Sequence, residues 1–138
     1  MAEEPEFFGP TRDALEAWLD RVTRKTGGEC YTDVIKFYLP TCRGKCRDAV
    51  NEFITKINKI FGGSTNYEAT GCWIDEEGEL LCEPVVVVES GHHCTKPHEA
   101  EEVGRALLTY AKKAGQRWLS VRQGKFYLFP YKPELIEE

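Results

Sequence analysis

Apolar side chains recur every three or four residues in two separate stretches of the chain. In 47–61 this spacing predicts an amphipathic helix that stops at Gly62, because glycine readily takes the left-handed conformation that ends a helix. In 97–115 the same spacing predicts a second helix, with Thr95 as its N-cap and Gly115 at its end. Each helix has one apolar face, so we expect each to pack on a sheet or on the other helix.

A second pattern, the alternation of apolar and polar residues, predicts β-strands before, between and after these helices. The expected strands cover 30–40, 64–75, 79–90, 118–121 and 125–130. A short turn at 76–78 joins the second and third strands into a hairpin. Pro84 lacks the N–H group that a strand inside a sheet uses, so we expect either a bulge there or a more exposed strand.

The order strand, helix, strand, strand, helix, strand predicts an α+β domain. With right-handed crossovers it leads to the ferredoxin-like βαββαβ fold, an antiparallel sheet with two helices on one face. The last predicted strand completes a C-terminal hairpin. We expect residues 1–29 to form an N-terminal helical appendage and residues 30–138 to form the ferredoxin-like domain.

The turn at 76–78 also fixes which residues of the two hairpin strands face each other. It places Cys72 opposite Cys82 and Thr65 opposite Glu89. The residues that follow Glu89 are therefore expected next to the glycine turn that precedes Thr65.

The two faces of the predicted sheet differ in their apolar content. On the hairpin strands the odd-numbered positions form the more apolar set and are expected to face the helices: Tyr67, Ala69, Trp73, Leu81, Val85 and Val87. The open face would then carry Thr70, Val86 and Val88, with Val34 and Tyr38 from the first strand. Because an open apolar face commonly binds a second copy of the chain, we expect a homodimer through it, unless the N-terminal helix covers it.

Six cysteines occur in a chain that has only five Asn and Gln residues and one Met. This depletion of heat-labile side chains, with 30% charged residues, indicates a hyperthermophile or a virus of one, where structural disulfides also form inside the cell. We expect the disulfides Cys72–Cys82, Cys42–Cys46 and Cys30–Cys94. The alternatives are free buried thiols and a zinc site made of Cys42, Cys46, Cys72 and Cys82.

All three histidines lie between positions 92 and 98, beside the predicted glycine turn. They are compatible with a zinc site, with a polar seam that caps the following helix, or with an anion site that uses glycine N–H groups and hydroxyls. The candidate ligand-binding residues are Gly62, Gly63, Ser64, Thr65, Glu89, His92, His93 and His98. We expect no metal or other cofactor there, and only modest affinity for phosphate or nucleotide because Glu89 repels a strongly anionic ligand.

A formal net charge of −5 argues against a protein that wraps duplex nucleic acid, because such proteins bind phosphates with many Lys and Arg residues. Small basic stretches occur only at 42–47 and 110–117. No apolar run approaches the ~20 residues that a membrane span needs. The acidic first residues do not form a signal peptide, so we expect a cytoplasmic protein.

The stretch "FGGSTNYEATGCWIDEEGELLCEPVVVVES" (61–90) resembles a recurrent pattern in small uncharacterised proteins of bacteria, archaea and their mobile elements. The shared features are a Phe-Gly-Gly-x-Thr turn, a Gly-x-Trp strand, an acidic glycine turn, and Glu followed by a valine-rich strand. This resemblance implies the ferredoxin-like fold and no particular reaction. The Cys and His residues are not part of the pattern.

Three functions are compatible with these features. The first is a non-catalytic binding or assembly protein, a dimer that holds a small anionic or nucleotide ligand, or a protein partner, at the 62–98 end. The second is a metal-independent phosphodiesterase or ribonuclease, in which two histidines act as base and acid and Ser64, Thr65 or Lys96 contacts the phosphate. The third is a zinc-stabilised structural module. We favour the first, because the sequence has no Walker loop and no Ser-His-Asp spacing that would support other enzyme classes.

Overall fold

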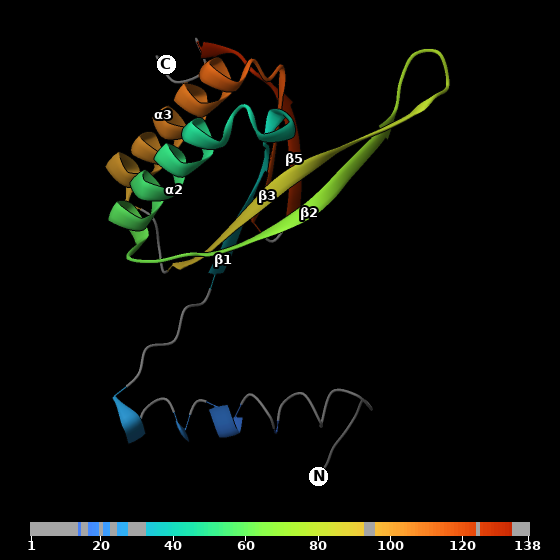
Figure 1. Ribbon diagram of the computed structural model, residues 1–138. Helices are drawn as coiled ribbons and strands as arrows, with labels where there is room; N and C mark the ends of the chain where they lie inside the picture. Colours follow the sequence, from blue (N-terminus) through green and yellow to red (C-terminus); the bar gives the residue numbers. More distant parts are fainter. Residues whose placement is uncertain are drawn as a thin grey trace. The chain divides into compact units, whose positions relative to one another are not determined.

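Figure 1 shows the computed structural model, which describes residues 33–92, 96–123 and 125–133, and residues 14, 17–19, 21, 22 and 25–27 near the N-terminus. The chain divides into two compact units, Met1–Tyr31 and Thr32–Glu138. The described residues of the first unit are helical up to Thr26, in line with the predicted N-terminal helix. The second unit holds the sheet and both long helices.

The elements of the second unit follow the predicted order. They are β1 (Asp33–Pro40), the 3-10 helix η1 (Cys42–Gly44), α2 (Arg47–Phe61), β2 (Thr65–Ile74), β3 (Leu80–His92), α3 (Pro97–Ala114), β4 (Trp118–Gln123) and β5 (Lys125–Pro130). The strands form one antiparallel sheet in the order β2-β3-β1-β4-β5, which confirms the α+β class. Within the described part of the chain, no helix is both long and apolar enough to span a membrane.

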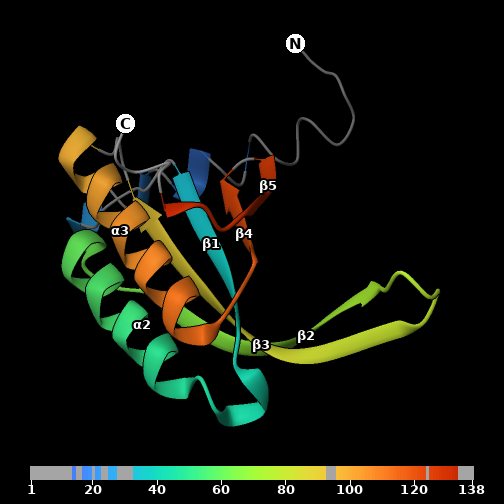
Figure 2. The same ribbon diagram turned by 90° about the horizontal axis from the view of Figure 1, so that it is seen from above.

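Both helices lie side by side on one face of the sheet (Figures 1 and 2). The core between these two layers is centred on three aromatic side chains, Phe37 of β1, Phe53 of α2 and Tyr110 of α3, each at most 1% exposed. Phe53 packs edge-on against both others, with ring centroids 4.9 Å from Phe37 and 6.4 Å from Tyr110. Aromatic pairs in this arrangement add to the stability gained from burial alone.

The helix ends agree with the predicted stop signals, and one start signal differs. Gly62 and Gly115 take positive φ angles of 93° and 65° and end α2 and α3 as predicted. The N-cap of α3 is Lys96, so the expectation of Thr95 is wrong by one residue. Pro97 forces the residue before it into an extended conformation, which is the conformation an N-cap requires, and the Glu99 carboxylate accepts a hydrogen bond from the Lys96 N–H (3.0 Å).

The faces of β2 and β3 are the reverse of those predicted. Val86 and Val88 belong to the core cluster beneath the helices, and Val88 is fully buried opposite Phe37. They were expected on the open face. The prediction counted Trp73 and Leu81 as core residues, but these two side chains are 48% and 40% exposed, and they lie on a part of the hairpin that extends beyond the sheet.

This extension is a two-stranded arm, residues 70–84, which projects away from the rest of the domain in Figure 2. It begins where β1 ends, because Pro40 pairs with Val85 and no residue of β1 pairs with the residues of β3 before it. The ladder between β2 and β3 runs through Pro84 without a bulge, and Pro84 is exposed, so the second of the two expected outcomes is observed. The Pro84 carbonyl accepts a hydrogen bond from Thr41 N–H (3.1 Å), so the backbone polar side of Pro84 faces away from β2 and its missing N–H removes no bond of that ladder.

Candidate functional site

The turn that was predicted to bind an anion uses several of its polar groups internally. Gly62 N–H donates to the α2 carbonyl four residues earlier (2.8 Å), and the Gly63 carbonyl accepts from Ser90 Oγ (2.7 Å). Ser64 Oγ lies 3.3 Å from the Asn66 Oδ1 that accepts its hydrogen bond. At the start of α3, Glu99 already occupies the end of the helix that attracts anions.

The histidines are placed only in part. His92 is the last residue of β3 and pairs with Asp33, while its side chain lies outside the described residues, as does His93. His98 is exposed in the first turn of α3. The convergence of the histidines on the glycine turn therefore stays a prediction, although Thr65 does pair with Glu89 as expected.

The best-formed polar cluster lies on the open face of the sheet and is built around Glu89; we name Glu89, Lys36 and Tyr67 the Glu89 cluster. Glu89 and Lys36 are direct partners across β3 and β1. Tyr67 OH donates to Glu89 Oε2 (2.9 Å), and Lys36 Nζ lies 3.2 Å from the same oxygen. Two strands, β2 and β1, thus contribute one side chain each to a single carboxylate oxygen of β3.

These contacts fix the charges of the cluster near neutral pH. The hydrogen bond from Tyr67, and then that from Lys36, hold the pKa of Glu89 below its usual value. The hydrogen bond to Glu89 raises the pKa of Lys36 and also that of Tyr67. A carboxylate, an ammonium and a neutral phenol therefore face solvent together, with the Glu89 and Lys36 side chains 28% and 33% exposed.

The open face around the cluster carries further polar and aromatic groups. Arg122 of β4 pairs with Lys36 across the sheet, and Tyr38 pairs with Val87 one row away. Val87 is 2% exposed, so this face has a closed apolar floor under its polar groups. Lys36 and Tyr67 were not among the predicted site residues, although the predicted register, which set Thr65 opposite Glu89, placed Tyr67 within diagonal reach of that carboxylate.

A shallow cavity of ≈ 230 Å³ lies between α2 and β2. Its lining residues are Arg47, Val50, Asn51, Ile54, Asn66, Tyr67, Glu68 and Val86. Arg47 and Glu68 form an ion pair here (3.0 Å), so the two charges that could recognise a ligand bind each other instead. The Glu89 cluster, in which one carboxylate oxygen has no described partner, is the stronger candidate.

Two of the three predicted disulfides are present. Cys72–Cys82 joins directly opposite residues of the arm, and Cys42–Cys46 closes the turn before α2. The Cys72 and Cys82 Cα atoms are 4.1 Å apart, slightly below the range of roughly 4.4–6.8 Å that is usual for disulfides and that we expect for this pair. The two residues form a pair without direct hydrogen bonds, which is the closer kind in an antiparallel ladder. The third predicted pair, Cys30–Cys94, lies outside the described residues.

These disulfides also bear on the alternative zinc site. All four cysteines that were considered as zinc ligands are oxidised in pairs, and a disulfide sulfur is not a thiolate ligand. Across the described ranges, no group of three or more His, Cys, Asp or Glu side chains converges as a metal site would require.

Comparison with known proteins gives a structural similarity only. No protein-family model and no curated protein matches the chain. A solved structure of a phage SAM lyase in complex with S-methyl-5'-thioadenosine superposes with a TM-score of 0.53 at 14% identity, over 71% of this chain and 88% of that one. The apo state of a phage SAM lyase gives a TM-score of 0.51 at 12% identity over the same fractions. At such identities the similarity shows a shared fold, and the first of these neighbours holds a small ligand in that fold.

Proposed function

We propose that this protein binds a small, neutral or zwitterionic ligand of the nucleoside type at the Glu89 cluster. The observation that carries the proposal is the shared use of one oxygen: Tyr67 and Lys36 both contact Glu89 Oε2, and no described residue donates to Oε1. A carboxylate held ionised, with one oxygen available, accepts hydrogen bonds from neighbouring hydroxyl or amino groups, such as those of a ribose.

The surroundings of Glu89 support the same class of ligand. Lys36 and Arg122 offer donors to ligand oxygen atoms, and the exposed Tyr67 ring on the same face offers a surface for a base to stack on. Glu89 disfavours a highly charged phosphate ligand by repulsion. This makes the proposed ligand less anionic than the nucleotide that the sequence suggested.

The fold comparison guides the choice of probe. The phage neighbour was solved with S-methyl-5'-thioadenosine, an uncharged nucleoside. The proposal includes the finer fold assignment, a ferredoxin-like βαββαβ unit extended by β5, which the strand order β2-β3-β1-β4 and the two helices on one face support.

Isothermal titration of S-methyl-5'-thioadenosine, adenosine, AMP and inorganic phosphate into the protein tests the proposal. We expect the two nucleosides to bind more tightly than AMP or phosphate. Glu89→Gln should weaken nucleoside binding by roughly ten-fold or more, since a hydrogen bond to a charged group contributes ~1.5–3 kcal/mol. Glu77→Gln, an equal change at the exposed tip of the arm, is the control and should bind like the wild type.

Equal binding by the wild type and Glu89→Gln contradicts the proposed site. Preferential binding of phosphate would instead support the anion site at the glycine turn. Incubation with SAM under the same conditions tests for SAM cleavage, which a binding protein does not carry out. The phosphodiesterase alternative is tested in parallel by hydrolysis of a phosphodiester substrate.

The homodimer expected from the sequence stays a proposal, although the open face gives it less support than expected. The open face is not the apolar surface expected from the sequence, since Val86 and Val88 are in the core and Lys36, Glu89 and Arg122 lie on the open side. A dimer through this face would compete with the ligand. The native mass, measured with and without S-methyl-5'-thioadenosine, distinguishes two possible dimer surfaces. A dimer that the nucleoside dissociates uses the Glu89 face, and a dimer that is insensitive to the nucleoside uses another surface.

A further inference from the structure

The two described disulfides lie in opposite electrostatic surroundings. Cys42–Cys46 frames a basic turn, in which Arg43 and Lys45 are exposed and have no ion-pair partner among the described residues. Cys72–Cys82 lies in the arm, whose tip and strands carry the acidic residues Asp75, Glu76, Glu77, Glu79 and Glu83. A thiolate is stabilised near positive charge and destabilised near negative charge, so the two pairs differ in how readily they exchange with thiols.

The position of Cys46 strengthens this difference. Cys46 is the N-cap of α2, and the first hydrogen bond of the helix is the one from Val50 N–H to the Cys46 carbonyl (3.0 Å). The N–H groups of the first helical turn consequently have no partner within the helix and point toward the N-cap. Asp48, the acidic residue of that turn, opposes the effect with one negative charge against the two positive charges of Arg43 and Lys45, while Arg47 is paired with Glu68.

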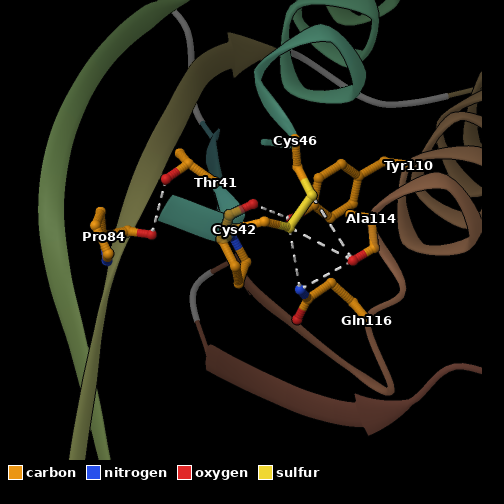
Figure 3. Close-up of a disulfide and its surroundings, with 8 residues drawn as sticks. Thr41, Cys42, Cys46, Pro84, Tyr110, Ala114 and Gln116 are labelled. Atoms are coloured by element: carbon orange, nitrogen blue, oxygen red, sulfur yellow. Dashed lines mark hydrogen bonds between the residues drawn. A yellow bond between two sulfur atoms is a disulfide. The ribbon is translucent and has the colours of Figure 1, made fainter. Parts of the chain in front are cut away.

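Cys42 has a different partner once it is reduced. Figure 3 shows both sulfurs beside the Ala114 carbonyl at the C-terminal end of α3, with the oxygen 3.5 Å from Cys42 Sγ and 3.8 Å from Cys46 Sγ. A disulfide sulfur has no hydrogen to donate, but a Cys42 thiol at this place can donate to that carbonyl. In the reduced state the Ala114 carbonyl can accept a hydrogen bond from either thiol, and Cys46, which makes no side-chain cap hydrogen bond as a disulfide, adjoins the unpaired N–H groups at the start of α2.

The rest of the structure allows this disulfide to open without unfolding the domain. On the N-terminal side, Thr41 is buried and donates to the Pro84 carbonyl, and Tyr110 OH donates to the Pro40 carbonyl (2.6 Å) (Figure 3). These bonds hold the end of β1 independently of the sulfurs. Cys42 and Arg43 both have a φ of 54°, which is unfavourable for residues other than glycine, and backbone hydrogen bonds from Gly44, Lys45 and Cys46 hold this turn without the sulfurs.

We propose that Cys42–Cys46 is a reversible thiol-exchange site for small anionic thiols of the glutathione class, and that Cys72–Cys82 is a permanent structural link. The thiolate of the small molecule attacks Cys42 Sγ, the Cys42–Cys46 bond breaks, and the electron pair leaves on Cys46 as a thiolate at the start of α2. A mixed disulfide then joins the small molecule to Cys42. A second small thiolate attacks the sulfur of the bound small molecule, releases its dimer disulfide, and leaves Cys42 to take a proton from water.

Exposure alone predicts the opposite selectivity. Cys72 and Cys82 are exposed, whereas Cys42 and Cys46 are half-buried. A thiol that responded only to access would reduce the arm first. The positive charge around Cys42–Cys46 predicts that an anionic thiol reduces this pair first, because a favourable local potential raises encounter rates by roughly ten-fold or more.

The test uses the full-length oxidised protein and thiols of three charges: glutathione, 2-mercaptoethanol and cysteamine. Reactions are stopped with acid, free thiols are alkylated, and peptide mass spectrometry reports the fraction of each pair reduced over time. With glutathione we expect Cys42–Cys46 to be reduced about ten-fold faster than Cys72–Cys82, and with cationic cysteamine we expect the ratio to fall and the order to reverse. The mixed disulfide with glutathione should map to Cys42.

The charge-neutral double variant Arg43→Gln/Lys45→Gln provides the matched control. It should lose most of the glutathione rate at Cys42–Cys46 while keeping the 2-mercaptoethanol rate within about two-fold. Far-UV circular dichroism should be unchanged after selective reduction. Faster reduction of Cys72–Cys82 by glutathione, the same order of reduction for all three thiols, or an unfolded protein after selective reduction would each overturn the proposal.

Discussion

The hydrogen bond from Tyr110 to the Pro40 carbonyl gives a quantitative prediction for the stability of the domain. Tyr110 is 1% exposed, and its hydroxyl lies 2.6 Å from an oxygen at the end of the central strand. Tyr110→Phe keeps the ring that packs against Phe53 and removes only the donor. Pro40 is half-buried, and a carbonyl shielded from water that loses its partner costs ~1–3 kcal/mol, so we expect the free energy of unfolding to fall by about 2 kcal/mol.

Urea denaturation followed by circular dichroism measures this change. For a chain of this length a loss of about 2 kcal/mol corresponds to a fall in Tm of roughly 8 °C. The control is Tyr67→Phe, which removes a hydroxyl from a residue that is 43% exposed and should change stability by less than about 0.5 kcal/mol. A loss below about 0.5 kcal/mol for Tyr110→Phe would show that the Pro40 carbonyl finds another donor and that the reasoning is wrong.

Tyr110→Phe also changes how the free energy of unfolding depends on pH in alkaline solution. Burial, and then the charge of Glu83, raise the pKa of Tyr110 above its ordinary value of 10.0. The unfolded chain therefore ionises at this position before the folded one does. The wild type loses stability as pH rises above about 10, and Tyr110→Phe removes this part of the pH dependence.

Two further predictions concern the core and the contact between the helices. Val88→Ala should lower the free energy of unfolding by about 2 kcal/mol, because Val88 is fully buried. The control Val34→Ala should lower it far less, because Val34 lies on the open face and is 48% exposed. Equal losses in the two variants would restore the predicted face assignment. The hydrogen bond from Lys113 holds the pKa of Glu52 below its usual value, so this ion pair contributes stability above about pH 4.5 that is lost as the pH falls further. Glu52→Gln should make the acid unfolding curve shallower in that range, and an unchanged curve would show that the pair is screened by solvent.

The local structure of this domain follows from sequence patterns of short range. The helix predicted over 47–61 coincides with α2, because both its apolar period and its glycine stop are local signals. The hairpin register also follows from a local signal, the short turn, and it correctly pairs Cys72 with Cys82. β3 continues two residues further than predicted, to His92, because β1 pairs with it as far as Asp33.

The faces of the sheet could not be predicted from β3 alone. The run of valines from Val85 to Val88 is apolar on both sides and so carries no alternation. The alternation in β1 does identify the core face, through Phe37 and its buried neighbours, and the pairing of Phe37 with Val88 extends that assignment to β3. That pairing joins distant parts of the chain and is not fixed by any turn, which is why the hairpin positions alone gave the wrong answer.

The candidate site likewise combines a residue that local sequence signals identify with one that only a long-range pairing adds. Glu89 was predicted as a site residue from its place beside the histidines, and it does lie at the centre of the polar cluster. Its partner Lys36 belongs to β1, more than fifty residues earlier, and looked like an ordinary solvent-facing residue of a half-buried strand. Only the antiparallel pairing of β1 with β3 brings the two together.

The arm provides the last prediction, because its apolar residues are the ones that misled the face assignment. Trp73 and Leu81 are paired across the arm and remain 48% and 40% exposed, so they contribute little to the core that holds the domain together. A cross-strand pair of this kind contributes ~0.2–1 kcal/mol. We expect the double variant Trp73→Ser/Leu81→Ser to lower the free energy of unfolding by less than about 1 kcal/mol and to leave the Cys72–Cys82 disulfide intact, as measured by urea denaturation and thiol titration. Two results together would contradict this: a loss above about 2 kcal/mol in the double variant, and a wild-type stability that rises with protein concentration. They would mean that a second copy buries these side chains and that the arm is a dimer contact.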